Sequence, residues 1–397
     1  MNFLKLKNII LKLENIIIFN KETLKNKNNS SYIFRLSKIK FLLTVCLIPI
    51  FIFLLKKKMN KIKIYKNNYV SNNTFNYLKD DNEFLKKLKI ILKEEELFEN
   101  ELMSKHTTFR IGGPAKYFVK PKTIKQIKKI INLCNEYNLK YFVLGNGSNL
   151  LVSDIGYLGV IIQIKGDNFS NLKVIKDDEN NYTILVGAGM LMRALSIESC
   201  LLSLTGLEDV VDIPGTIGGG IIMNVSFRGT GLSKSLIKVK VITPEGKIKE
   251  LSKKECGLYH RGSKLKDMKY IVVEAVFKLK KGDQMIIQKT MTDNTKNRYK
   301  KQPMYFGSAG CFFIWNHTEN GSLYKKYKES NLVSYRVGNI MIYTYNISFI
   351  VNLGKGTASE VIEIVEYITK IMKEKYNIEM KREVIVIGTI YFLYFIL

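Results

Sequence analysis

The stretch that most constrains this chain is residues 212–224, DIPGTIGGGIIMN. It places one proline and four glycines within seven positions and then continues into apolar chain. Glycines at that density leave backbone N–H groups uncovered and let a ligand approach the main chain. Residues 144–150, LGNGSNL, have the same character. Either stretch alone is more often a tight turn between strands. Together they predict a cradle for phosphate or a flat cofactor ring.

Size and charge limit the classes of protein to consider. With 397 residues, 46% of them hydrophobic, the chain can bury a large core in two or three domains. A formal charge of +28 ordinarily suggests nucleic acid or an anionic membrane. However, residues 1–66 hold fifteen Lys or Arg against two acids, and the later lysines lie singly on apparent helix faces. No clustered basic and aromatic face is evident, so we expect no nucleic-acid partner.

Cysteine and histidine patterns argue against two other classes. The five cysteines form no C-x-x-C pair, and the three histidines form no H-E-x-x-H arrangement. The sequence therefore predicts no disulfide framework and no metal site, which fits a reducing cytoplasm.

The N-terminal region contains one apolar run, residues 41–55, flanked by lysines. As a helix it would span ~22 Å, short of the ~30 Å hydrocarbon core of a bilayer. Snorkelling lysines could make it a marginal membrane anchor. It could equally be a signal-like segment, or follow from a start codon placed before Met59.

The folded part begins near residue 82 with alternating helices and strands. A helix over 84–99 precedes a strand at 117–119, a helix that starts at Thr123, and a strand at 141–144 that ends at the glycine stretch 144–150. This order is typical of an α/β domain that binds phosphate at strand ends. The chain then continues as strand, unlike a Rossmann fingerprint, so we expect turn amides to hold the phosphate without a helix dipole. Further predicted elements are strand 183–189, helix 191–202, a hairpin around 244–246, strand 271–279, helix 284–300, a helix capped by Thr357 and Glu360, and strand 384–387.

Seven motifs carry a resemblance to a known family. They are TTFRIGGPA, LGNGSNLLVSD, DIPGTIGGGIIMN, the Arg261-x-Ser263 pair, SAGC, FIVNLG and REVIVIG. In this order and spacing they resemble UDP-N-acetylenolpyruvoylglucosamine reductases, flavoenzymes of bacterial peptidoglycan synthesis. The resemblance covers residues 82–388 and leaves no room for the extra substrate loop of the longer class, so the chain is similar to the shorter class.

The resemblance implies an α+β chain: a vanillyl-alcohol-oxidase-like FAD-binding fold of two α/β subdomains plus a C-terminal α+β substrate domain. The implied segments are a basic extension with its apolar run (1–81), FAD-binding subdomains 1 (82–153) and 2 (154–282), the substrate domain (283–388) and an apolar tail (389–397). The implied ligands are FAD, NADPH and a UDP-sugar, namely UDP-N-acetylglucosamine enolpyruvate, which is reduced to UDP-N-acetylmuramate. The implied state is a cytoplasmic monomer, with membrane association through 41–55 left open.

The resemblance also assigns roles to residues. Arg261 matches the catalytic arginine, and a guanidinium can grip the substrate carboxylate through two hydrogen bonds. Glu383 matches a glutamate that helps polarise the same group, and Cys311 stands where most members carry a proton-donating serine. A thiol with a pKa of ~8.5 is a stronger acid than an alcohol and is mostly protonated near neutrality. The implied FAD-binding residues are Gly145, Asn146, Gly147, Ser148, Asn149, Leu150, Pro214, Gly215, Thr216, Gly218, Gly219 and Asn224.

Four positions depart from the family pattern. His260 replaces the tyrosine before Arg261, with Tyr259 one residue early, and Val225 begins a segment that replaces small residues near the flavin. Trp315-Asn316 replaces Asn-Pro, and residues 344–346 replace a charged cluster. Two hypotheses remain open at this point: an active NADPH-dependent reductase, or a diverged FAD-binding relative with lost or altered activity.

Overall fold

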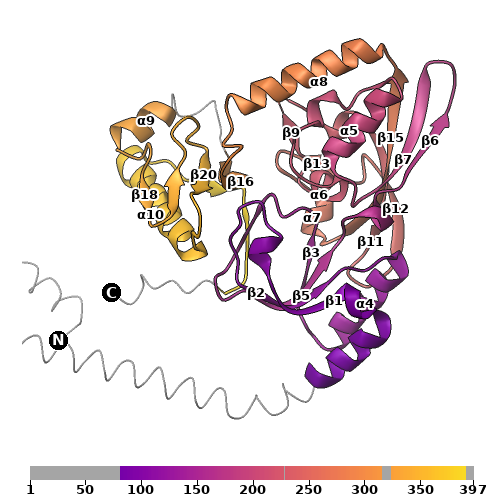
Figure 1. Ribbon diagram of the computed structural model, residues 1–397, viewed down its shortest axis with the longest axis horizontal. Coiled ribbons are helices and arrows are strands. Elements are labelled where there is room, and N and C mark those ends of the chain that lie inside the picture. The colour runs from indigo at the N-terminus through magenta and orange to yellow at the C-terminus, as the bar shows by residue number, and fades with distance from the viewer. Residues whose placement is uncertain (1–80, 228, 315–322, 390–397) are drawn as a thin grey trace, which may run out of the picture. The chain divides into compact units, whose positions relative to one another are not determined.

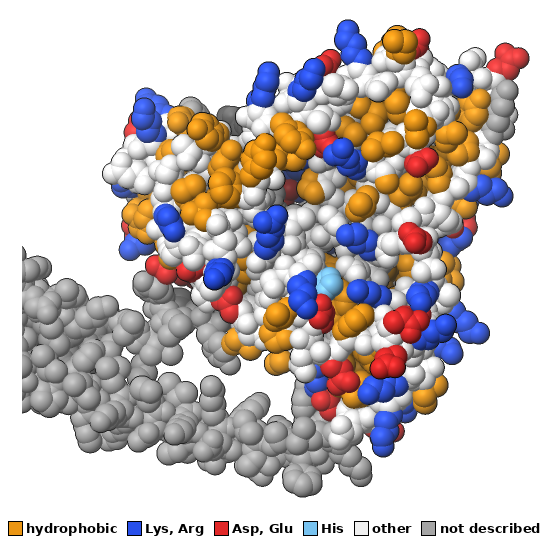
Figure 2. All heavy atoms as spheres, viewed as in Figure 1, with side chains coloured by type: hydrophobic (Ala, Val, Ile, Leu, Met, Phe, Trp, Pro, Cys, Tyr) orange, Lys and Arg blue, Asp and Glu red, His pale blue; other side chains and the backbone are white. Residues whose placement is uncertain are grey.

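The computed structural model describes residues 81–227, 229–314 and 323–389, and the described residues from 83 onward belong to one compact unit (Figure 1). The apolar run 41–55 and nearly all of the predicted apolar tail lie outside the described residues. Within the described residues, no helix has the length and apolar character needed to cross a membrane. The visible face in Figure 2 carries basic side chains interspersed with acidic ones.

The first sheet has the strand order β1-β2-β5-β3. Strands β2 (Pro114–Val119), β5 (Tyr157–Gln163) and β3 (Tyr141–Leu144) run parallel, and β1 (Leu97–Leu102) is an antiparallel edge. Helix α4 (Ile124–Glu136) begins at the capping box of Thr123 and buries its apolar face beneath the strands. Because β5 is a central strand here, this sheet extends past the predicted subdomain boundary at 153.

One predicted helix is wrong over its second half. The chain is helical over residues 81–91, not to 99. Three consecutive glutamates, Glu94–Glu96, form a short 3-10 turn, and β1 then pairs with β2. Glutamate is itself a good helix former, so the pairing of β1 with β2, and not local propensity, decides the conformation of residues 97–102.

The second sheet is antiparallel, with the order β12-β11-β15-β7-β6 and the short β8 paired to β15. The hairpin β11–β12, the long strand β15 and helix α5 occupy residues that the sequence predicted. The bounds are β6 (Leu172–Lys176), β7 (Asn181–Gly187), α5 (Met192–Leu201), β8 (Leu204–Thr205), α6 (Ile217–Ile222), β11 (Leu236–Ile242), β12 (Ile248–Ser252) and β15 (Ile271–Lys281).

The C-terminal region contains a third sheet, ordered β16-β20-β19-β18. Helix α10 (Ala358–Tyr376) begins at the predicted capping box and buries its predicted apolar face against this sheet. Helix α8 (Gln284–Tyr299) lies beside α5 and the 3-10 turn η6 (Glu208–Val210), although the predicted boundary at 283 assigned it to the substrate domain (Figure 1). The bounds are β16 (Gly307–Cys311), α9 (Leu323–Glu329), β18 (Arg336–Val337), β19 (Ile340–Ile342) and β20 (Phe349–Asn352).

The end of the chain returns to the first glycine stretch. Strand β22 (Ile385–Ile387) pairs in parallel with β4 (Leu150–Val152), which follows that stretch directly. Residues from opposite ends of the folded region therefore meet beside one loop. The remaining short elements are η4 (Met103–Lys105), η5 (Asp167–Phe169), β9 (Ser226–Phe227), β10 (Thr230–Gly231), η7 (Leu232–Lys234), β13 (Leu258–Tyr259), β14 (Gly262–Ser263), α7 (Lys264–Asp267), β17 (Phe313–Ile314) and β21 (Lys381–Arg382).

Candidate functional site

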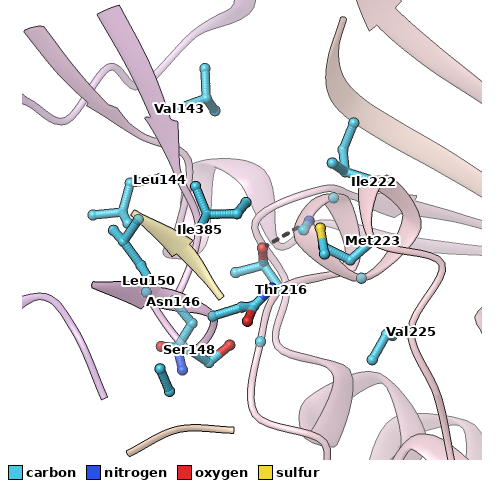
Figure 3. Close-up of a pocket in the computed structure, with 18 of the residues that line it drawn as sticks. Val143, Leu144, Asn146, Ser148, Leu150, Thr216, Ile222, Met223, Val225 and Ile385 are labelled. Carbon is cyan, nitrogen blue, oxygen red and sulfur yellow. Dashed lines mark hydrogen bonds between the residues drawn. The ribbon is translucent and has the colours of Figure 1, made fainter. Parts of the chain in front are cut away.

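A cavity of about 1200 Å³ is lined by both glycine stretches and by segments of all three sheet regions. Figure 3 shows Asn146 and Ser148 of the first stretch on one side and Thr216, at the start of α6, on the other. Eleven of the twelve predicted FAD-binding residues and all three predicted catalytic residues line this cavity. Asn224 is the exception.

The first glycine stretch presents unused backbone amides to the cavity. The N–H groups of residues 146–149 have no hydrogen-bond acceptor among the described residues. Gly147 has φ = 64°, and a Cβ there would lie 2.1 Å from the carbonyl oxygen of His106, so only glycine fits. The carbonyl of Gly147 in turn accepts a hydrogen bond of 3.2 Å from the N–H of Thr108. The loop is held from behind while its amides face the cavity, as an anion site requires.

The second glycine stretch contains a short helix where the sequence suggested only a turn. Thr216 caps α6 by accepting a hydrogen bond of 3.4 Å from the N–H of Gly219. The Ser148 hydroxyl donates to the Pro214 carbonyl at 2.6 Å, which joins the two stretches directly.

Two adjacent positions of α6, 218 and 219, hold glycine for different reasons. A Cβ on Gly218 would lie 3.0 Å from the Cβ of Ala188 and 3.3 Å from its carbonyl oxygen, so packing within the protein requires glycine. A Cβ on Gly219 would meet nothing nearer than the Thr216 hydroxyl at 3.5 Å. Gly219 lines the cavity, so its missing side chain leaves ligand space that the protein itself does not use.

Arg261 lies in the two-residue turn between β13 and β14 and has φ = 57°. A non-glycine residue in this left-handed region carries strain of about 1 kcal/mol, and such strain often accompanies function. The Nε of Arg261 lies 3.3 Å from Oε1 of Glu383, and Nη1 donates to the Ser226 carbonyl at 3.5 Å. The guanidinium is 24% exposed, so it is partly shielded but accessible from the cavity.

The backbone of Glu383 is held by two hydrogen bonds. Its N–H donates to the Phe312 carbonyl at 2.9 Å, and its carbonyl accepts from the side-chain amide of Asn149 at 3.3 Å. The N–H of Ile385 donates to the Asn149 carbonyl at 3.1 Å. The Glu383 carboxylate therefore stands between the strand region after Cys311 and the first glycine stretch.

Burial shapes the titration of Cys311 and Glu383. The pKa of the Cys311 thiol is raised from 9.0 to about 11, mainly by removal from water and also by the Glu383 carboxylate, while Arg261 and Arg298 act in the lowering direction. Burial also raises the pKa of Glu383, while Arg261 acts in the opposite direction. A thiol in this environment keeps its proton through neutral pH and is available to donate it.

Two charged residues of the cavity wall were missed by sequence reasoning. Arg298 on α8 is 6% exposed and lines the cavity, and Asp212, the first residue of the glycine stretch, lines it too. The sequence predicted the helix over 284–300, but its apolar spacing did not show which face meets the cavity. Asn224 is held differently from its prediction, because its side-chain amide donates to the Tyr259 carbonyl at 2.9 Å beside the Arg261 turn.

The departures from the family pattern have separate positions. Val225 lines the cavity, as does Asn346, whose amide also donates to the Lys301 carbonyl at 3.0 Å. Tyr259 and His260 are exposed and do not line it, and the Tyr259 hydroxyl donates to the Asp267 carboxylate at 2.9 Å. Residues 315 and 316 lie outside the described residues.

The wall fits FAD. Unused amides suit a diphosphate, the open side of Gly219 leaves room for a flat ring, and Arg261 and Arg298 supply positive charge. The cavity volume exceeds what one small ligand needs, which is consistent with a cofactor and a substrate side by side.

Comparison with protein families gives two matches. Residues 115–252 match a family model described as FAD binding domain, and residues 302–387 match UDP-N-acetylenolpyruvoylglucosamine reductase, C-terminal domain. The predicted FAD-binding fold with its C-terminal substrate domain is confirmed.

Whole-chain relatives agree with these matches. The chain is 36% identical over 308 residues to the UDP-N-acetylenolpyruvoylglucosamine reductase of Lachnoclostridium phytofermentans, covering 78% of this chain and 98% of the relative. It is 37% identical over 294 residues to that of Bacillus pumilus, covering 74% and 94%. The crystal structure of the reductase from Thermus caldophilus aligns with a TM-score of 0.60 at 30% identity, covering 72% of this chain and 98% of that one.

Proposed function

The chain belongs to the UDP-N-acetylenolpyruvoylglucosamine reductase family, and we propose that Arg261, Cys311 and Glu383 are the residues with which it reduces its substrate. The family assignment makes it an FAD-dependent UDP-N-acetylmuramate dehydrogenase of peptidoglycan precursor synthesis, with NADPH as the reductant. The residue roles below are our inference from the cavity.

FAD held by the two glycine stretches would supply the redox chemistry, the transfer of a hydride that originates from NADPH to the enolpyruvyl double bond. The protein must then stabilise negative charge that builds toward the substrate carboxylate and deliver one proton to the adjacent carbon. Arg261 suits the first task, because its guanidinium lines the cavity and is held by Glu383 and the Ser226 carbonyl. A guanidinium fixed in advance needs little reorganisation when the charge develops.

Cys311 suits the second task. Its thiol lines the cavity, and burial raises its pKa to about 11, so the proton is present at neutral pH. Donation leaves a thiolate, which Arg261 and Arg298 stabilise electrostatically. Glu383 keeps Arg261 in place, and its negative charge helps keep the thiol protonated until the proton is transferred to the substrate carbon.

The observation that carries the proposal is the convergence of three distant segments. A hairpin turn, the end of β16 and the residue after β21 bring Arg261, Cys311 and Glu383 into one cavity wall beside both glycine stretches. An ordinary surface ion pair would not also line a cavity with a partly buried thiol and a cradle of free amides.

The half-reactions of Cys311→Ala test the proposal. Flavin reduction by NADPH, followed at 450 nm under anaerobic conditions, should change by less than twofold. Reoxidation by the enolpyruvyl nucleotide should slow by about 10²- to 10⁴-fold, the usual contribution of a general acid. Cys256→Ala is the matched control, because that thiol is fully buried and does not line the cavity. If both half-reactions fell together in Cys311→Ala, the donor role would be wrong.

We also propose that the enzyme works as a cytoplasmic monomer, since its nucleotide substrates belong to that compartment and its cavity is completed within one chain. Sedimentation of the full chain checks the oligomeric state, and a mass of twice the monomer would refute it. Cell fractionation checks the compartment, and recovery with membranes would instead implicate residues 41–55.

A further inference from the structure

Asp212 carries a buried carboxylate that the proposed reaction does not use. Its side chain is 3% exposed and lies in the cavity wall at the start of the second glycine stretch. A carboxylate at such a position should oppose the binding of an anionic ligand, and burying it is unfavourable unless cations or hydrogen-bond donors compensate. Its partners therefore indicate why it is there.

Two helices supply direct partners to Asp212. Nη1 of Arg193, on α5, donates to Oδ1 at 2.8 Å, and the hydroxyl of Thr295, on α8, donates to Oδ2. The Arg193 side chain is 60% exposed, so it neutralises the carboxylate from the solvent side. The contact with Thr295 ties the glycine stretch to α8.

Arg298 follows Thr295 by three positions, so both side chains lie on one face of α8. Arg298 is buried in the cavity wall, and its Nη2 donates to Oε1 of Gln302 at 2.8 Å. The hydrogen bond between Asp212 and Thr295 lies one helical turn before Arg298, and both charged residues line the same cavity, so the junction of the glycine stretch and α8 brings the carboxylate and the guanidinium to one wall. In agreement with this placement, the charge of Asp212 acts to raise the pKa of the guanidinium, although burial, the larger influence, lowers it.

We propose that Asp212 is a positioning residue for the FAD site: its buried carboxylate holds the guanidinium of Arg298 in the cavity wall, where that guanidinium presents positive charge to the cofactor. FAD carries a diphosphate, so a fixed cation in the wall strengthens its binding. This role and that of a simple wall charge predict opposite changes in FAD affinity when the charge of Asp212 is removed. An isolated carboxylate repels the diphosphate, whereas a carboxylate that orients a cation promotes binding.

The first measurement is the dissociation constant of FAD from the full-length apoprotein, by quenching of flavin fluorescence. Asp212→Asn keeps the size of the side chain and removes its charge. We expect at least a tenfold weaker affinity for FAD. Unchanged or tighter binding would mean that Asp212 acts only as a repulsive wall charge, and the proposal would fall.

A double-mutant cycle tests whether Asp212 acts through Arg298. In an Arg298→Met background, Asp212→Asn should change the affinity for FAD by less than twofold. Equal effects of Asp212→Asn with and without Arg298 would refute the coupling.

Asp209 provides a matched control for general docking of α8. It lies in the same loop, and its carboxylate accepts a hydrogen bond of 3.0 Å from the Asn294 amide on the same helix. Asp209→Asn should lower the melting temperature about as much as Asp212→Asn while changing FAD affinity by less than twofold. If Asp209→Asn weakened FAD binding equally, the role of Asp212 would be ordinary packing of the helix.

A second variant protects the test against misfolding of Asp212→Asn. Thr295→Val removes one hydrogen bond to the same carboxylate and leaves both charges in place. We expect a three- to fivefold loss of FAD affinity, and wild-type affinity in a folded Thr295→Val protein would contradict the proposal. None of these measurements involves turnover, so their outcome is independent of the roles proposed for Cys311 and Glu383.

Discussion

Replacing Gly219 by alanine should separate the stability of the protein from its affinity for FAD. The new Cβ would meet no protein atom nearer than the Thr216 hydroxyl at 3.5 Å, an ordinary contact. Alanine also favours a helix over glycine by up to about 1 kcal/mol. We therefore expect the apoprotein to be as stable as the wild type, or more so. The methyl group would instead occupy cavity space, and overpacking against a ligand costs about 1–3 kcal/mol, or about 5- to 150-fold in affinity.

Gly218→Ala is the contrasting variant. Its Cβ would press on the Cβ of Ala188 at 3.0 Å, so the added methyl group meets protein atoms first. It should lower the free energy of unfolding by about 1–3 kcal/mol. Urea unfolding of the apoprotein and FAD titration give, for each of the two variants, a free energy of unfolding and a dissociation constant for FAD. If Gly219→Ala bound FAD as tightly as the wild type, the open side of α6 would not contact the cofactor, and the assignment of this cradle would be wrong.

Three further predictions concern the same wall and the buried thiols. Ser148→Ala removes the 2.6 Å hydrogen bond between the glycine stretches, so FAD affinity should fall about fivefold, for a net loss near 1 kcal/mol; an unchanged titration would contradict this. Glu383→Gln removes the charge that helps raise the pKa of Cys311, so iodoacetamide should alkylate Cys311 faster at pH 8.5. Substrate turnover should fall by about 10²-fold in the same variant. Slower alkylation would refute the electrostatic reasoning. Burial is the main cause that raises the pKa of Cys256 from 9.0 to about 11, so the folded state binds the thiol proton more tightly than the unfolded state does. The free energy of unfolding should therefore fall as the pH rises from 9 to 11, by at most about 1.4 kcal/mol per pH unit. Cys256→Ala should reduce this pH dependence in urea unfolding at pH 8 and 10.5.

Local sequence signals predicted most elements because side-chain spacing and caps act locally. Thr123 and Thr357 cap α4 and α10 where expected, since each sits three positions before a Gln or Glu that completes the capping box. The helix expected over 84–99 failed because strand pairing between β1 and β2 depends on residues that are distant in sequence. The subdomain boundaries at 153 and 283 stay predictions, and local signals could not show that β5 pairs with β2 and β3 or that α8 packs beside α5 and η6.

Site residues that belong to a sequence motif could be predicted, whereas those brought to the cavity by packing could not. Arg261, Cys311 and Glu383 were identified from motif resemblance, and the cavity brings them together. Arg298 and Asp212 were not identified, because an arginine in a largely polar helix and a single aspartate give no sign of burial in the sequence. The left-handed φ of Arg261 was equally hidden, since it arises from the two-residue turn that β13 and β14 impose.

The position of the Glu383 carboxylate depends on one strand register. Ile385, the first residue of β22, pairs with Leu150 at the end of the first glycine stretch. Glu383 therefore lies two residues before β22. Slipping the register by two residues would move Glu383 by about 6.6 Å, far beyond the 3.3 Å that separates it from Arg261. A slip by one residue would turn its side chain to the opposite face of the strand. The hydrogen bonds of Asn149 to both Glu383 and Ile385 fix this register from the glycine loop itself. Because one loop provides the amides of the cofactor cradle and also sets the position of the carboxylate, a ligand that orders this loop should at the same time align Glu383 with Arg261.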